Sequence, residues 1–331
     1  MLREYAFEPS LVQDADVYRL LSEQLGIDQG RLLGHSCDWF KRAWEALDEA
    51  NPDMLRMELL AQLQGPDSRQ FCQQRHPTCS GDDDGRRGWF EIAIDSHQMH
   101  PFELVVTDSE PDGRIPNRRI ASPSEVGTHD KWKRGMGAPQ VDKQPKSIVE
   151  ALGVFPSASC ELRFVDPYFN PAEERWRDLP RSVIQSALGP PFSSMDGKLH
   201  VEFHTSWNED KVERYGTVES MVERYWPDFL RHSCNSVSSA HLVVWDHIVL
   251  KEDHDRFLIS EIGCFAIGAG FDCGTRGAIR TTVNWMDSET SQRLYNKFSA
   301  LTSNHSTRIH LVFDQDGTVV HRRPHRTVMN G

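Results

Sequence analysis

The stretch KEDHDRFLISEIGCFAIGAGFD, residues 251–272, is the most specific pattern in the chain. Its centre is typical of a β-strand that continues through a turn into a second strand. Side chains two residues apart on a strand share a face, so we expect His254 and Arg256 to project together. A guanidinium binds two phosphoryl oxygens at once, and an imidazole can attack phosphorus or transfer protons near neutral pH. The pair therefore indicates a site that handles phosphate.

Three further residues of this stretch fit the same interpretation. Glu261 could orient the guanidinium or the imidazole, and Gly268 and Gly270 would let the backbone approach an anion closely. The alternative is a plain surface feature, because a polar segment before an amphipathic strand is common and a His-x-Arg pair also arises by chance. Features elsewhere in the sequence are needed to choose between a phosphate site and a plain surface segment.

Length, charge and cysteine content limit the possible classes of protein. A chain of 331 residues suits one large domain or two, and its net charge of -12 argues against a protein that coats duplex DNA by neutralising phosphates. The seven cysteines are scattered, and the chain opens MLREYAFEPS without an apolar signal region. This combination predicts reduced thiols in a cytoplasmic protein. No apolar run approaches the length of a membrane span.

The N-terminal part is predicted to be mainly helical. Apolar residues recur at helical spacing in three segments, residues 16–25, a segment from Asp38 and a segment from Pro52. A strand is expected at residues 102–107, and residues 89–94 fit either a strand or a helix. We place the domain boundary near residue 145, with a mainly helical region with a long loop at 1–145.

From residue 146 to residue 331 the pattern alternates between strands and helices, which favours an α/β layer structure. The expected strands are residues 160–169, 198–206 and 240–250, the stretch quoted above, and a final pair across the Asp316-Gly317 turn. The expected helices are residues 180–188, 217–232 and 288–301.

The spacing within residues 251–272 resembles the phospholipase D superfamily motif: His-x-Lys, four residues, Asp, six residues, Gly-Ser. His254, Arg256, Glu261 and Gly268 fall in this register without a gap. The surrounding order, a strand ending in FVDPYF, a helix, a second strand and then the motif, is similar to one half of that fold. The resemblance covers residues 155–320 and looks most like divergent bacterial phospholipase D-like proteins. It implies a mixed sheet flanked by helices, and a setting in bacterial defence or mobile elements.

The resemblance also implies a mechanism without metal or cofactor. His254 would form a phosphohistidine, Arg256 would hold the developing charge and Glu261 would orient the site. One motif provides one histidine, whereas the leaving group needs a separate proton donor, so a symmetric homodimer is implied. A nuclease is favoured over a lipase because no apolar interfacial helix is evident. Nucleic acid, or another phosphodiester, is the expected substrate, and protein partners in a larger system are a further possibility.

The chain departs from the superfamily pattern at four positions. Arginine replaces lysine at 256, glutamate replaces aspartate at 261, Ala269 stands in place of serine and Phe271 in place of asparagine. Some domains of this superfamily keep the fold without hydrolysis. The alternative function is therefore an inactive module that binds a phosphate-bearing ligand or a protein partner.

Polar residues on two other strands are candidates for a site. His200, Glu202 and His204 share one face of a predicted strand and could serve as metal ligands. Alternate strand residues are about 7 Å apart, so the first and last cannot easily share one ion. We favour a polar strand face, with His204 near the motif at the end of its strand. Asp166, at the end of an earlier strand, fits either a turn former or a substrate-binding residue.

Cys72, His76 and Cys79 form a second candidate metal cluster, in a segment with the composition of a surface loop. Their spacing, C-x3-H-x2-C, supplies three ligands, whereas a structural zinc takes four in tight pairs. The sequence alone leaves zinc binding open at this position.

Overall fold

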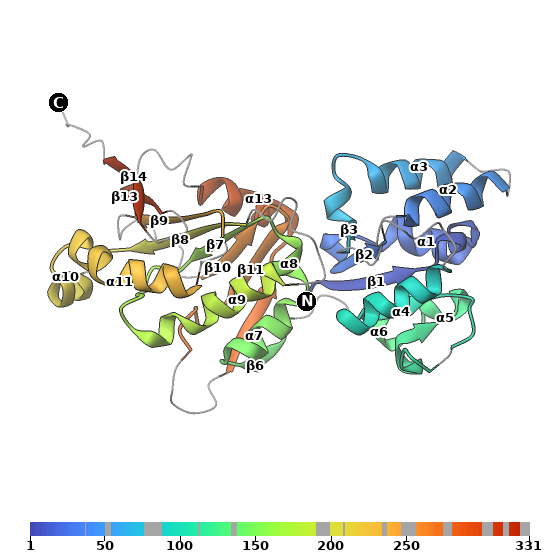
Figure 1. Ribbon diagram of the computed structural model, residues 1–331, viewed down its shortest axis with the longest axis horizontal. Helices are drawn as coiled ribbons and strands as arrows, with labels where there is room; N and C mark the ends of the chain where they lie inside the picture. The colour runs from blue at the N-terminus through green and yellow to red at the C-terminus, as the bar shows by residue number, and fades with distance from the viewer. Residues whose placement is uncertain are drawn as a thin grey trace. The chain divides into compact units, whose positions relative to one another are not determined.

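The computed structural model describes residues 1–324 except 37, 50–53, 76–87, 112, 134–137, 190–198, 208, 234–236, 246–255, 274–279, 300–306 and 314–317. The chain forms two compact units, which Figure 1 traces from blue to red. Residues 1–137 belong to the first unit, and residues 138–188 and 194–331 belong to the second. Among the helices of the described residues, none has the length and apolar character needed to cross a membrane.

The first unit is built on a five-stranded parallel sheet with the order β3-β2-β1-β4-β5. Its strands are β1 (Arg3–Phe7), β2 (Arg31–His35), β3 (Cys72–Gln74), β4 (Leu104–Val106) and β5 (Ile120–Ala121). Its helices are α1 (Ala15–Glu23), α2 (Trp39–Glu49), α3 (Met54–Gln64), α4 (Trp89–Met99), α5 (Pro123–Val126) and α6 (Asp130–Lys133). The three expected helices are confirmed as α1, α2 and α3, and the expected strand at 102–107 is confirmed as β4.

The prediction of a mainly helical N-terminal region is wrong, because these helices accompany a parallel sheet. Parallel strands are usually buried on both faces and therefore lack the alternation of polar and apolar residues that marks a strand in a sequence. In β4 all three residues are buried, and β5 is only two residues long. The segment at 89–94, for which strand and helix were both open, is the start of α4.

A buried ion pair joins β1 to the residue that follows β3. Arg75 donates from Nε to Oε1 of Glu4 at 2.7 Å and from Nη1 to the carbonyl oxygen of Ser96 at 2.9 Å. Its Cζ atom lies 3.3 Å from the centroid of the Phe102 ring. Gly34 of β2 leaves room for this pair, because a Cβ atom there would overlap the Glu4 carboxylate. The ion pair therefore requires glycine at position 34.

The second unit contains a nine-stranded mixed sheet with the order β14-β13-β9-β8-β7-β10-β11-β12-β6. Three adjacent strands, β9, β8 and β7, are parallel, and the remaining neighbours pair antiparallel. The strands are β6 (Gln140–Asp142), β7 (Glu161–Val165), β8 (His200–Ser206), β9 (Ser239–Trp245), β10 (Phe257–Ser260), β11 (Gly263–Ile267), β12 (Arg280–Trp285), β13 (Thr307–Phe313) and β14 (Val319–Pro324). The helices are α7 (Pro145–Leu152), α8 (Phe155–Ala158), α9 (Asp178–Leu188), α10 (Glu209–Tyr215), α11 (Val218–Ser233) and α13 (Ser288–Lys297). The α/β class is confirmed, and each strand and helix expected in this half corresponds to a described element, whereas residues 246–250 and 300–301 and the Asp316-Gly317 turn lie outside the described residues.

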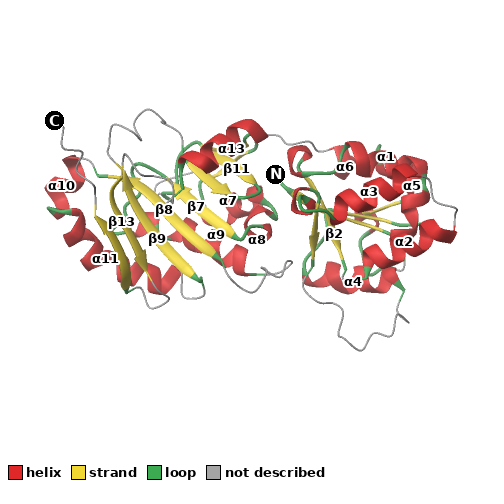
Figure 2. Ribbon diagram, turned by 90° about the horizontal axis from the view of Figure 1, so that it is seen from above, coloured by secondary structure: helices red, strands yellow, loops and turns green. Residues whose placement is uncertain are grey.

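Helices cover both faces of this sheet (Figures 1 and 2). On one face Phe203 of β8 stacks on Phe164 of β7, and Trp226 and Phe229 of α11 pack against Phe203 with ring centroids 5.3 and 5.2 Å away. On the other face Leu294 of α13 packs with apolar residues of β7, β9, β10 and β11. The alternation of side chains along β7 and β8 thus serves two separate cores.

Replacement of Gly34 by alanine should destabilise the first unit. The added methyl group displaces the buried Glu4 carboxylate from Arg75, so we expect a loss of roughly 3 kcal/mol in the free energy of unfolding. Urea unfolding followed by circular dichroism measures it. Gly127→Ala is the matched control, because Gly127 has φ of −65° and the nearest atom to its added Cβ is 4.0 Å away. Equal midpoints for the two variants would contradict the explanation.

Candidate functional site

Asp166 occupies the carboxyl end of β7 and is completely buried. Its Oδ1 atom accepts a hydrogen bond from the main-chain N–H of Tyr168 at 2.8 Å, and its Oδ2 atom accepts one from the N–H of Phe271 at 3.2 Å. One carboxylate therefore joins the loop after β7 to the segment after β11. The sequence allows two roles for Asp166, as a turn former or as a substrate-binding residue, and its position in the structure is compatible with both.

The glycines of the motif lie beside this carboxylate. Gly270 has φ of 76°, and a Cβ atom there would lie 2.6 Å from Oδ2 of Asp166 and 3.4 Å from Nε of Arg256. A Cβ atom at Gly268 would lie 2.6 Å from Oγ1 of Thr282. Both glycines are thus explained by close approach of protein atoms to the backbone.

Arg256 precedes β10 and faces the same end of the sheet. Its main-chain oxygen accepts from Ile267 at 2.7 Å, and its Nη1 atom donates to the carbonyl oxygen of Gly268 at 3.4 Å. The guanidinium Cζ lies 5.4 Å from the ring centroid of Tyr168. Within the described residues the buried Nε atom has no hydrogen-bond partner. We call Asp166, Tyr168, Arg256, Gly268 and Gly270 the Arg256 site.

Burial raises the pKa of Asp166 to about 6. The hydrogen bonds from Tyr168 and Phe271 and the positive charges of Arg256 and Lys211 oppose this effect without cancelling it. Asp166 is therefore ionised for the most part at neutral pH, and it gains a proton in mildly acidic solution.

Lys211 is a neighbour of the site that the sequence did not indicate. It lies in α10 with only 5% of its surface exposed. Its Nζ atom donates to the main-chain oxygens of Phe169 at 3.0 Å and Ser206 at 2.8 Å and to Oγ1 of Thr205 at 2.9 Å. Burial lowers the pKa of Lys211 to about 7. A lysine in an acidic helical segment is usually exposed, so nothing in the local pattern predicts this burial.

A pocket of about 150 Å³ adjoins the Arg256 site. We call it the Tyr168 pocket; it is lined by Tyr168, Asn170, Glu173, Arg175, Trp176, Lys211 and Arg214. Glu173 holds two of its cations, because its carboxylate accepts from Nε of Arg175 at 2.8 Å and from Nη1 of Arg214 at 3.0 Å. Tyr168 belongs both to the pocket and to the Arg256 site.

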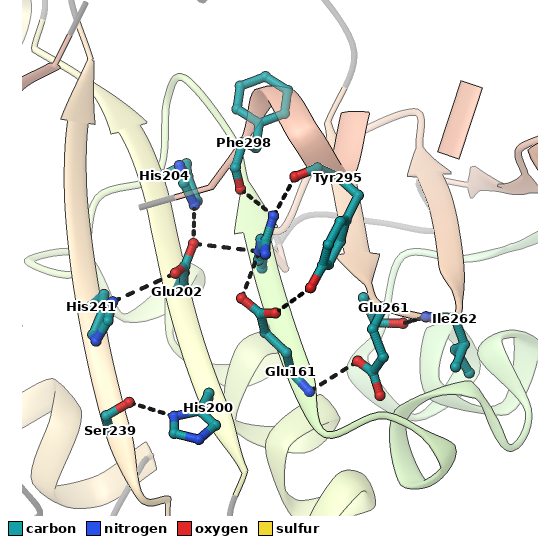
Figure 3. A network of polar contacts seen from close by, with 12 residues as sticks. Glu161, His200, Glu202, His204, Ser239, His241, Glu261, Ile262, Tyr295 and Phe298 are labelled. Atoms are coloured by element: carbon teal, nitrogen blue, oxygen red, sulfur yellow. Dashed lines mark hydrogen bonds and ion pairs between the residues drawn. The ribbon is translucent and has the colours of Figure 1, made fainter. Parts of the chain in front are cut away.

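Glu261 lies at the opposite end of β10 from Arg256. Its Oε1 atom accepts from the N–H of Cys160 at 2.6 Å. Its Oε2 atom accepts from the N–H of Glu161 at 3.1 Å (Figure 3). Five residues of extended chain separate Glu261 from Arg256, which corresponds to about 16 Å. The structure therefore separates these two residues, and Glu261 fastens the β10–β11 turn to the start of β7.

His204 is likewise held in a different environment. It is completely buried in β8, and its Nδ1 atom accepts a hydrogen bond from Nε1 of Trp245 at 2.9 Å. The proton of the ring is therefore on Nε2, which donates to Oε2 of Glu202 at 2.9 Å (Figure 3). Burial lowers the pKa of His204. The ring is therefore a neutral part of the protein interior, while the main-chain oxygen of His204 accepts from the N–H of Asp166 at 3.0 Å.

A polar network surrounds His204 on the α13 face of the sheet. Arg163 of β7 donates from Nε to Oε1 of Glu161 at 2.7 Å and from Nη1 to the carbonyl oxygen of Phe298 at 2.7 Å. Oε1 of Glu202 lies 3.5 Å from Nδ1 of His241 (Figure 3). Although burial favours the neutral acid, the hydrogen bond from His204 and the neighbouring His241 and Arg163 side chains hold the pKa of Glu202 well below its usual range.

Of the two candidate metal clusters, only His200, Glu202 and His204 lie wholly within the described residues, and these three are not arranged around one ion. His200 is exposed and its Nδ1 atom pairs with Oγ of Ser239 at 2.7 Å, away from Glu202 and His204. Among the residues that the structure describes, no group of three or more His, Cys, Asp or Glu side chains is arranged to hold a metal ion. Cys72 is buried and donates from Sγ to the carbonyl oxygen of Leu63 at 3.1 Å.

Three of the predicted residues lie outside the described residues: His254, His76 and Cys79. Of the others, the structure brings Asp166, Arg256, Gly268 and Gly270 together and places Glu261 at the opposite end of β10. His204 lies beside Asp166 through its main chain, but its ring is engaged by Glu202 and Trp245. In comparisons with known proteins, the chain matched no protein-family model, no curated protein and no solved structure. The function is therefore argued from the residues of the Arg256 site.

The buried Asp166 carboxyl should give a pH-dependent contribution to stability. Because the folded-state pKa is about 6 and the ordinary value is 3.8, the folded protein binds extra protons between these values. This contribution is fully present below about pH 4 and is lost as pH rises through 6. Relative to Asp166→Asn, which cannot titrate, the wild-type free energy of unfolding should fall by on the order of 3 kcal/mol between these limits.

Denaturant unfolding of both proteins at a series of pH values measures this difference. Asp16→Asn, which removes an exposed carboxylate from the first unit, controls for the loss of charge. A stability difference that does not change with pH would show that Asp166 titrates normally.

Proposed function

We propose that the chain is a metal-independent phosphodiesterase of the phospholipase D type that acts on nucleic acid. The observation that supports it is the gathering of Arg256, Asp166 and the glycine segment at one end of the nine-stranded sheet. His254 stands two residues before Arg256 in the chain. Arg256 offers a partly exposed guanidinium there, which is suited to phosphoryl oxygens.

In the proposed reaction a ring nitrogen of His254 attacks the phosphodiester. A nitrogen–phosphorus bond forms, the phosphorus–oxygen bond to the leaving group breaks, and the leaving oxygen takes a proton from a second histidine. Water then attacks phosphorus, returns a proton to that histidine and releases His254. Arg256 stabilises the negative charge on the phosphoryl oxygens in both steps.

The second histidine would be His254 of another copy of the chain in a twofold dimer. Asp166 would position the site, since its contacts to Phe271 and Tyr168 hold the segments on either side of Arg256. Glu261 would act at a distance, through the β10–β11 turn, and not by touching the substrate.

A second candidate function is an inactive phosphate-binding module. It is favoured by Ala269 and Phe271, which replace the serine and asparagine of the superfamily pattern. Phe271 is buried against Phe164, with ring centroids 5.3 Å apart, and only its N–H contributes to the site. Binding of nucleic acid without any cleavage would select this function.

Hydrolysis of labelled single- and double-stranded DNA and RNA should persist in EDTA. His254→Ala should abolish it, whereas His232→Ala, an exposed histidine on α11, should leave it unchanged. Arg256→Ala should lower kcat by a factor on the order of 100 or more, and Arg256→Lys should retain part of the activity because lysine keeps the charge. Activity that appears only after a divalent cation is added would exclude the phosphohistidine mechanism.

Mixing of wild-type and His254→Ala chains tests the dimer. If both histidines are needed, a mixed dimer completes no turnover, so an equal mixture after subunit exchange should retain about a quarter of the wild-type activity. Sedimentation establishes whether the dimer forms. Retention of half the activity would mean that each chain works independently with another proton donor.

A further inference from the structure

The Tyr168 pocket begins where the Arg256 site ends. Tyr168 is 41% exposed and belongs to both, because its ring centroid lies 5.4 Å from the Arg256 guanidinium carbon and the residue lines the pocket. The other walls come from the loop after β7, from the 3₁₀ helix Glu174–Trp176 and from α10. A phosphodiester held by Arg256 would therefore place its neighbouring nucleotide at the mouth of this pocket.

The size of the pocket fits one flat ring. A cavity of about 150 Å³ is known to hold benzene in another protein. Two aromatic side chains, Tyr168 and Trp176, line the pocket, and Trp176 is fixed in the core with only 6% of its surface exposed. Proteins that bind single-stranded nucleic acid combine exposed aromatic rings, on which bases stack, with cationic side chains that bind the phosphates. Tyr168 beside Arg256 is such a pair.

Hydrogen bonds within the protein already hold the polar side chains of the pocket before any ligand binds. Nδ2 of Asn170 donates to Oε1 of Glu173 at 3.2 Å and to the hydroxyl of Tyr215 at 3.0 Å. Glu173 in turn orients Arg175 and Arg214, and each guanidinium carries five N–H donors, so these contacts do not exhaust them. These groups can hydrogen-bond the edge of a heterocyclic ring.

The charge of the pocket is also suited to a nucleotide. Its lining includes three cationic side chains, Lys211, Arg175 and Arg214, and one carboxylate. Lys211 is engaged by main-chain oxygens and its pKa is lowered to about 7, so the permanent positive charge of the pocket comes from Arg175 and Arg214. The excess of positive charge favours a ligand that brings a phosphate with it.

We propose that the Tyr168 pocket binds one unpaired nucleobase next to the phosphodiester held at Arg256, so that the preferred substrate is a single-stranded nucleic acid. The inference rests on the proposed function. A base within a duplex is paired and stacked between its neighbours and has to leave the helix to enter such a pocket. Single strands present their bases without this cost.

Fluorescence anisotropy with His254→Ala as the parent protein separates base binding from anion binding. The probes are labelled oligothymidine, an abasic oligomer of the same length, and a duplex of the same length. Tyr168→Ala should weaken binding of oligothymidine by about 5- to 150-fold, the range of one stacking contact, and Tyr168→Trp should restore it. Binding of the abasic oligomer and the duplex should be weaker at the outset and unaffected by the substitution.

Matched controls exist in the first unit. Tyr18→Ala is the control for Tyr168→Ala, because Tyr18 also lies beside an arginine, with Cζ of Arg56 5.7 Å from the centroid of its ring. Arg19→Ala is the control for Arg214→Ala, because the two arginine side chains are almost equally exposed. Neither control should change binding, whereas Arg214→Ala should weaken oligothymidine binding.

The outcomes separate this inference from the proposed function. If Arg256→Ala weakens every probe but Tyr168→Ala weakens none, the base pocket is excluded and the phosphate site stands. Equal losses for oligothymidine and the abasic oligomer would replace the base pocket with an anion site. If neither Arg256→Ala nor Tyr168→Ala alters the binding of any probe, or if no probe binds, both proposals are wrong.

Discussion

The Asp166 carboxylate, shared between the N–H groups of Tyr168 and Phe271, is the contact on which the candidate site depends. A buried carboxylate is costly unless it is hydrogen-bonded and close to positive charge. Here two main-chain donors satisfy its oxygens, and Arg256 and Lys211 provide the charge. The group stays ionised at neutral pH although burial opposes it. Because its partners belong to the segments after β7 and after β11, the same interaction fixes the end of the sheet at which Arg256 stands.

The two faces of the nine-stranded sheet divide the polar chemistry of the second unit. The face under α13 contains a closed network in which Arg163, Glu202 and His204 satisfy one another. Such a network orients strands and excludes alternative packings, and its members are engaged within the protein. The end of the sheet at Asp166 is different, because Arg256 there is partly exposed and adjoins a pocket. Polar residues in strands therefore do not by themselves indicate a binding site. The end of the sheet at Asp166 differs from the network under α13 because Arg256 is accessible to solvent.

Local patterns predicted most strands and the three longest helices of the second unit, because apolar alternation and helical spacing are properties of short segments. They did not predict β6, β12, α7, α8 or α10. The parallel sheet of the first unit was not predictable in this way, since its strands are short and buried. Phe271, one of the two residues that donate to the Asp166 carboxylate, is 105 residues away in the chain, and no local sequence pattern predicts such a contact. The position of Glu261 could have been derived: the rise of a strand alone places it about 16 Å from Arg256. Lys211 gave no signal, because its burial depends on how α10 packs.

The β10–β11 hairpin is fastened at both ends through main-chain amides. Glu261 holds the turn on the N–H groups of Cys160 and Glu161, and Asp166 holds the open end on the N–H of Phe271. Main-chain donors are present whatever the side chain, so the backbone path does not depend on the residues at 256 and 269. The hairpin therefore keeps its course through main-chain hydrogen bonds, so substitutions at 256 and 269 change the chemistry of the exposed end without removing the contacts that hold the strands.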